Sequence, residues 1–153
     1  MCAKRRILLT LALLATAAWI FFIWERSAQN AEESMEESGW VMKLVENLLP
    51  GISAHLVRKL AHVTEFLILG GLLWTDCRLL GKERTLFTLC VGLAVAGADE
   101  FHQTFVPGRS GQLSDVLIDF FGVVLSVLLL GLLSSRSKLR MQRQIESTKK
   151  PLE

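Results

Sequence analysis

Four long apolar segments constrain the fold of this chain more than any other feature of its sequence. They lie at residues 7–24, 60–80, 86–101 and 113–133. A helix needs about 20 mainly apolar residues to cross the hydrocarbon core of a bilayer, so segments of this length predict transmembrane helices. The chain has 153 residues, and 51% of them are hydrophobic, which is more than an ordinary soluble domain carries. We therefore expect an all-α, polytopic membrane protein with four transmembrane helices.

A cleaved signal peptide is the competing interpretation of the first apolar segment, which follows three basic residues near the N-terminus. The segment at 7–24 is long for the apolar part of a signal peptide, and it ends in bulky side chains. The residues at 29–31, Gln-Asn-Ala, also make a poor cleavage site, because such sites need small residues. We therefore favour a transmembrane helix.

Residues 25–59 form the only long polar connection, and their second half is patterned. Apolar side chains recur there in adjacent pairs, four positions apart, at 40, 41, 44, 45, 48 and 49. This spacing predicts an amphipathic helix, which Pro50 and Gly51 would end. Such a helix could lie in the membrane interface or pack onto the bundle, and the sequence leaves both alternatives open.

The distribution of Lys and Arg predicts the orientation of the four helices. Twelve of these residues lie in the N-terminal stretch, in the connection at 78–84 and in the tail, and the other five lie in the remaining connections and segment ends. Cytoplasmic loops carry the excess of basic residues, so we expect both termini to be cytoplasmic. The net charge of only +2 gives no argument for nucleic acid as a partner. The three cysteines, Cys2, Cys77 and Cys90, fit neither a disulfide framework nor a zinc site.

Polar side chains gather at the outer ends of the last three apolar segments. Within each segment they are three or four residues apart, which places them on one helical face. Charged groups at membrane depth cost about 2.5–3.5 kcal/mol each on insertion scales, so they indicate a functional site. We expect an outward-facing ligand-binding site made by Lys59, His62, Glu65, Asp99, Glu100, His102, Gln103, Arg109, Ser110, Asp115 and Asp119.

Two motifs within this set carry a resemblance to a known family. The sequence K-L-A-H-V-T-E-F begins at Lys59, and A-D-E-F-H-Q-T-F-V-P-G-R-S-G-Q-L-S-D-V-L-I-D-F-F-G begins at Ala98. Together they resemble the VanZ-like family of bacterial membrane proteins over about residues 58–131. The resemblance implies a place in the plasma membrane of a bacterial cell envelope. It also implies a role in resistance to glycopeptide antibiotics of the teicoplanin type, and it transfers no catalytic role to any residue.

The predicted organisation is a single core with extensions at both ends. We expect a cytoplasmic N-terminus at 1–6, a transmembrane helix at 7–24, an extracytoplasmic segment with the amphipathic helix at 25–59, a VanZ-like core with three transmembrane helices at 60–133, and a basic cytoplasmic tail at 134–153.

Three hypotheses account for the polar residues, and the first is a divalent metal site. Carboxylate oxygens with imidazole suit Mg²⁺, Mn²⁺ or Zn²⁺. A bound metal could activate water against a lipid-linked phosphate, which would make the protein a hydrolase or transferase. No established cofactor follows from the sequence, but the candidate ligands are Glu65, Asp99, Glu100, His102, Asp115 and Asp119.

The second hypothesis is that the site binds an anionic headgroup without chemistry. Arg109 lies in the sequence Pro-Gly-Arg-Ser-Gly directly before a helix start, where backbone N–H groups and a guanidinium suit a phosphate. The partners would be membrane lipids or a lipid-linked wall precursor. Asp115 and Asp119 oppose this unless Lys59, His62 or a metal offsets their charge.

The third hypothesis is structural. Lys59 and Arg109 would pair with the acids, and the network would fix the register of the helices without binding anything. We favour headgroup binding, with the metal-dependent enzyme and the structural network as alternatives.

Overall fold

The computed structural model describes residues 3–29, 47, 51–82 and 84–149. Four helices account for most of them: α1 (Ala3–Ala28), α3 (Ala54–Leu80), α4 (Thr85–Gln103) and α5 (Leu113–Lys149). The described residues contain no strand, so the all-α prediction is confirmed. The predicted amphipathic helix falls almost entirely outside the described residues, because only Asn47 of that stretch is included.

Each helix is longer than the apolar segment that predicted it. The helix predicted at 60–80 begins at Ala54, where Ser53 accepts a hydrogen bond from the backbone of Leu56 at 3.3 Å and caps the N-terminus. It ends at Gly81, which takes a left-handed conformation with φ of 70°. The last helix continues from the apolar segment into the basic tail as far as Lys149. Apolar content thus predicted the middle of each helix, and in α3 the caps Ser53 and Gly81 mark where the helix starts and stops.

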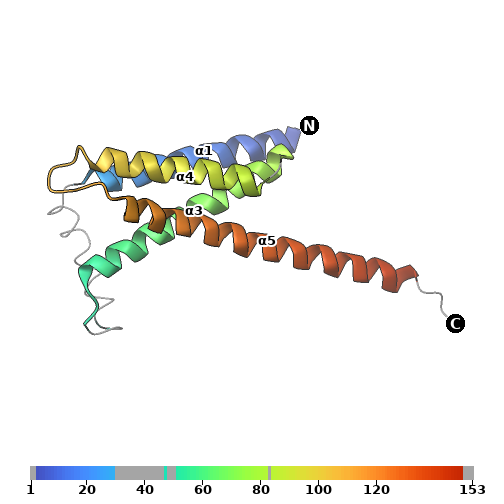
Figure 1. Ribbon diagram of the computed structural model, residues 1–153. Helices are drawn as coiled ribbons and strands as arrows, with labels where there is room; N and C mark the ends of the chain where they lie inside the picture. The colour runs from blue at the N-terminus through green and yellow to red at the C-terminus, as the bar shows by residue number, and fades with distance from the viewer. Residues whose placement is uncertain (1–2, 30–46, 48–50, 83, 150–153) are drawn as a thin grey trace.

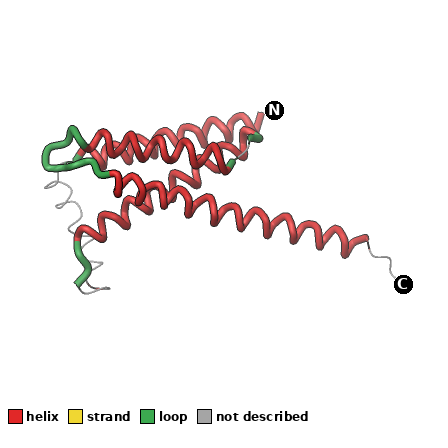
Figure 2. The backbone as a smooth tube through the Cα atoms, in the orientation of Figure 1, coloured by secondary structure: helices red, strands yellow, loops and turns green. Residues whose placement is uncertain are grey.

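The helices form a bundle with one long arm (Figure 1). α1 and α4 lie side by side along much of their length, and α3 crosses behind them. α5 packs most extensively against α3, and its C-terminal half then extends away from the other helices. The connection between α4 and α5 lies at the end of the bundle opposite the N-terminus (Figure 2).

Glycines allow α3 and α5 to approach closely where they cross. A Cβ added to Gly122 would collide with the carbonyl oxygen of Val63, and one added to Gly70 would lie 2.8 Å from the Cβ of Ser126. Small residues at such contacts let helices pack tightly in lipid. Around this crossing the buried apolar core consists of Ile23, Phe66, Leu69, Leu73, Ala96 and Val123.

Large apolar side chains also cover the outside of the bundle. Phe21 on α1 is 63% exposed and Leu132 on α5 is 60% exposed. Two described helices, Ala3–Ala28 and Leu113–Gln142, are long and apolar enough to cross a membrane, and only 11% and 28% of their apolar stretches are buried. A core helix of a soluble protein would be mostly buried, so these helices indicate a membrane protein. α3 and α4 are not apolar enough to meet the same criterion of hydropathy and charge, because acids and histidines interrupt their apolar sequence.

Candidate ligand-binding site

A polar cavity of about 140 Å³ opens at the end of the bundle that holds the α4–α5 connection. It lies between the first turns of α3, the end of α4, the connection and the start of α5. Seven of the residues predicted from the sequence line it, namely Lys59, His62, Glu100, Gln103, Arg109, Ser110 and Asp115. Residues that are up to 56 positions apart in the chain therefore share one cavity.

A hydrogen-bond network around Gln103 builds the wall on the α4 side. Its amide nitrogen donates to Asp99 Oδ2 at 3.0 Å and to Glu100 Oε1 at 3.1 Å. Its amide oxygen accepts from Arg109 Nη1 at 3.4 Å. The second oxygen of Glu100 accepts from the backbone N–H of Gln112 at 2.9 Å, which holds the connection against α4. Gln103 thus links an acidic pair inside the bundle to the arginine of the connection.

Arg109 faces the cavity with incomplete hydrogen bonding. Its Nε is buried and has no hydrogen-bond partner among the described residues. Burial lowers the pKa of Arg109 from its ordinary value, and the positive charge of Arg58 across the cavity lowers it further. Two guanidinium groups that repel each other within one polar cavity favour an anion between them.

The rim of the cavity on α3 is also basic. Lys59 Nζ pairs with Asp115 Oδ1 at 3.2 Å, and both side chains are about one-third exposed. His55 and Arg58 line the cavity from the same helix, although the sequence interpretation omitted them. Their spacing could have revealed them, because His55 lies four residues before Lys59 and Arg58 four residues before His62.

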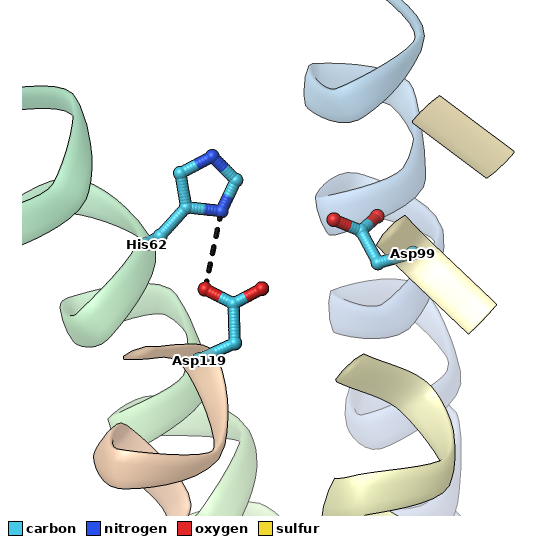
Figure 3. A group of neighbouring side chains, drawn as sticks. All are labelled: His62, Asp99 and Asp119. Atoms are coloured by element: carbon cyan, nitrogen blue, oxygen red, sulfur yellow. Dashed lines mark ion pairs between the residues drawn. The ribbon is translucent and has the colours of Figure 1, made fainter. Parts of the chain in front are cut away.

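A second group of polar side chains lies buried behind the cavity, on three different helices. His62 on α3, Asp119 on α5 and Asp99 on α4 point toward one another (Figure 3). His62 Nδ1 lies 3.5 Å from Asp119 Oδ1, and one ligand atom from each of the three residues falls within 4.8 Å of the others. Asp99 and Asp119 are 0% and 1% exposed, so both carboxyl groups are out of contact with solvent.

Two predicted residues contact the first helix. His102 stacks on Trp24 of α1, with ring centroids 5.4 Å apart. Glu65 lies on α3 at the contact with α1, where its backbone carbonyl accepts a hydrogen bond from Trp19 Nε1 at 2.9 Å. Neither residue lines the cavity. The first helix therefore covers the side of the site that these two residues occupy.

Only two of the six predicted metal ligands come together in one group. Asp99 and Asp119 come together, and they do so with His62, which was not among the candidates. Within the described residues, Glu65, Glu100, His102 and Asp115 do not join a group of three potential ligands. Asp115 pairs with Lys59, and Glu100 accepts hydrogen bonds from amide groups.

The sequence interpretation also missed a buried polar pair at mid-bundle. Thr16 Oγ1 of α1 donates to Asp76 Oδ2 of α3 at 2.7 Å, and both residues are buried. A second acid within the apolar segment at 60–80, besides Glu65, was the available signal. This pair lies apart from the cavity and ties the first helix to the core.

Comparison with protein families identifies the chain. The VanZ/LLP1 family model matches residues 12–134, which include most of α1, all of α3 and α4, and the apolar part of α5. The chain belongs to the VanZ/LLP1 family. The match contains every residue of the cavity and of the buried His62 group, so these features lie within the VanZ/LLP1 region. Searches of curated proteins and of solved structures each gave no match.

Proposed function

We propose that this VanZ/LLP1 protein binds the phosphate-bearing headgroup of a lipid or lipid-linked wall precursor in its polar cavity. In a bacterial envelope, this binding would lower susceptibility to glycopeptide antibiotics of the teicoplanin type. The observation that carries the proposal is the pair Arg58 and Arg109. Both line the cavity, and neither makes an ion pair with an acid among the described residues.

The chemistry of the cavity favours a phosphate over a neutral ligand. Arg presents a planar fork of N–H donors that matches phosphate oxygens, and such charge-assisted hydrogen bonds are stronger than neutral ones. Lys59 and His55 add further donors at the rim. A volume of about 140 Å³ accommodates a headgroup phosphate but not a whole precursor, so the rest of the ligand would lie outside, along the bundle.

We also propose that the protein lies in the plasma membrane, with four transmembrane helices and both termini in the cytoplasm. α3 has 27 residues and α4 has 19, which correspond to about 40 Å and 28 Å of helix, so α3 exceeds and α4 nearly matches a hydrocarbon core of about 30 Å. The N-terminus lies beside the α3–α4 connection, since Arg5 Nε donates to the carbonyl of Leu79 at 3.0 Å. The basic N-terminal stretch and the basic α3–α4 connection therefore lie at one end of the bundle, and the cavity lies at the other.

The test removes each arginine in turn. Arg58→Ala and Arg109→Ala should each weaken binding of a phosphate-headgroup lipid by roughly 10–100-fold, since a hydrogen bond to a charged group contributes about 1.5–3 kcal/mol. Arg109→Lys should weaken it less, because the charge stays and the fork is lost. The measurement is lipid binding to the full chain in detergent, beside teicoplanin susceptibility of cells at matched expression.

The matched control is Arg136→Ala, because Arg136 is exposed on α5 beyond the apolar stretch. It should leave both binding and susceptibility unchanged. Unchanged binding in Arg58→Ala and in Arg109→Ala would refute headgroup binding. A loss of thermal stability that matches every loss of binding would instead support the purely structural network.

A metal-dependent hydrolase or transferase remains the second candidate, and the buried group of His62, Asp99 and Asp119 favours it. An enzyme of this kind would release a product from a lipid-linked phosphate, whereas a binding protein would return the ligand unchanged. Incubation of the purified chain with such a substrate, with and without a chelator, distinguishes them.

A further inference from the structure

We propose that His62, Asp99 and Asp119 form a binding site for one divalent transition-metal ion, with Zn²⁺ the best fit, buried behind the polar cavity. Three separate helices supply the ligands, one from each (Figure 3). The inference rests on these three side chains and does not require that the cavity bind an anion.

The geometry is close to that of a zinc centre. Zn–N and Zn–O bonds of about 2.1 Å place neighbouring ligand atoms of a tetrahedral site about 3.4 Å apart. His62 Nδ1 and Asp119 Oδ1 already lie 3.5 Å apart, and the ligand atoms of all three residues fall within 4.8 Å. Small side-chain rotations would therefore complete three ligands around one ion.

One polar atom of each residue also lacks a hydrogen-bond partner. His62 Nδ1, Asp99 Oδ1 and Asp119 Oδ2 are buried and accept or donate no hydrogen bond within the part of the chain that the structure describes. Because Asp99 and Asp119 are 0% and 1% exposed, water does not solvate these oxygens from bulk. A buried, unpartnered carboxylate is costly, and a divalent cation between two of them cancels their charge.

The neighbouring residues support the same assignment. Gln103 donates to Asp99 Oδ2 at 3.0 Å, which fixes the orientation of the carboxylate. Hydrogen bonds of this kind orient metal ligands and raise affinity. One imidazole with two carboxylates suits Zn²⁺ or Mn²⁺ better than Mg²⁺, which prefers oxygen ligands and water.

Asp76 is a buried acid that lies outside the group of His62, Asp99 and Asp119, and it serves as a comparison. It is also buried, at 3% exposure, and its Oδ1 likewise lacks a hydrogen-bond partner among the described residues. Its Oδ2 accepts from the hydroxyl of Thr16, and it belongs to no group of three potential ligands within that part of the chain. Convergence of two acids and an imidazole therefore distinguishes the Asp99 and Asp119 site from a general tolerance of buried carboxyl groups.

The position of His62 gives the ion an open side. His62 lines the cavity and also belongs to the buried group, so a fourth ligand would enter from the cavity. A site with three protein ligands and one open position can take water or a ligand oxygen. A phosphate in the cavity would then contact both the ion and the arginines.

The experiment measures metal binding by the full chain in detergent after treatment with a chelator. Calorimetric titration with Zn²⁺ and elemental analysis should give one ion per chain. His62→Ala, Asp99→Asn and Asp119→Asn should each weaken Zn²⁺ binding by more than about 100-fold, which exceeds the roughly 10–100-fold effect of an outer-shell change such as Gln103→Leu.

Two controls keep the result specific. Asp115→Asn removes an acid that lines the cavity but lies outside the group, and it should bind Zn²⁺ as the parent chain does. His62→Cys supplies a thiolate in place of the imidazole and should restore binding that His62→Ala loses. Loading with Co²⁺ should give the visible absorption of a tetrahedral site in the parent chain and not in Asp119→Asn.

Three results overturn the proposal: no Zn²⁺ or Mn²⁺ binding by the parent chain, unchanged affinity in the three ligand variants, or equal loss in Asp115→Asn. These outcomes differ from a failure of headgroup binding. Arg109→Ala should lose the lipid and keep the metal, whereas Asp119→Asn should lose the metal whether or not lipid still binds.

Discussion

The two ends of the bundle both carry basic residues, and they use them in different ways. At the end that holds the N-terminus, Arg5 donates to a backbone carbonyl near the end of α3, and Arg84 lies 5.8 Å from the ring centroid of Trp74. At the cavity end, Arg109 turns inward, toward Gln103 and the acids of α4. The first arrangement caps a helix and packs a cation on an aromatic ring, and the second builds a polar interior.

The comparison shows that the surroundings of a charge, rather than its identity, indicate its role. The basic end combines cations with backbone carbonyls and an aromatic ring, all near the surface. The cavity end combines cations with three buried carboxyl groups, an imidazole and incompletely paired donors. Only the second set is costly to maintain without a ligand.

The largest expected effect concerns the sidedness of the two ends. In a chain without its native cysteines, Thr104→Cys at the cavity end and Ser135→Cys on the arm of α5 give single, exposed labelling positions. The reagent is a maleimide that cannot cross the plasma membrane, applied to bacterial cells whose plasma membrane is intact. It should label position 104 fully and position 135 only after lysis. The reverse pattern would place the cavity in the cytoplasm and invert the proposed topology.

A second prediction concerns the helix crossing that brings the cavity end together. Gly122→Ala should lower the free energy of unfolding by about 3 kcal/mol, because the new Cβ meets the backbone of α3 and cannot be relieved by a side-chain rotation. The control is Gly131→Ala, since a Cβ there meets nothing within 4 Å. Thermal unfolding in detergent measures both, and equal stability of the two variants would contradict the close packing.

The smallest expected effect is at the rim. Lys59 and Asp115 are partly exposed, so their ion pair should contribute only about 0.5 kcal/mol. A double-mutant cycle with Lys59→Met and Asp115→Asn measures this coupling energy. A coupling energy above roughly 2 kcal/mol would mean that Lys59 and Asp115 are shielded from water as strongly as the buried group. That result would contradict the difference drawn here between an exposed rim and a buried interior.

The sequence by itself determined the all-α class, the approximate positions of the four described helices and the family. Apolar length and charge spacing are local properties, and the VanZ-like motifs lie within two continuous stretches. The same locality explains why seven cavity residues were predicted, since residues three or four apart on a helix share a face. The end of α3 at Leu80 matched the predicted segment, but its start did not, because capping by Ser53 depends on backbone geometry that hydropathy does not report.

Only the tertiary structure decided which of these residues meet. Asp99 and Asp119 join His62 rather than Glu65 or His102, because the crossing of α3 and α5 at Gly70 and Gly122 fixes their rotation and depth. α1 covers Glu65 and His102 with Trp19 and Trp24, which no pattern within the later segments could predict. Periodicity gives the face of each helix, but the angle at which two helices cross depends on the shapes of the side chains that pack between them.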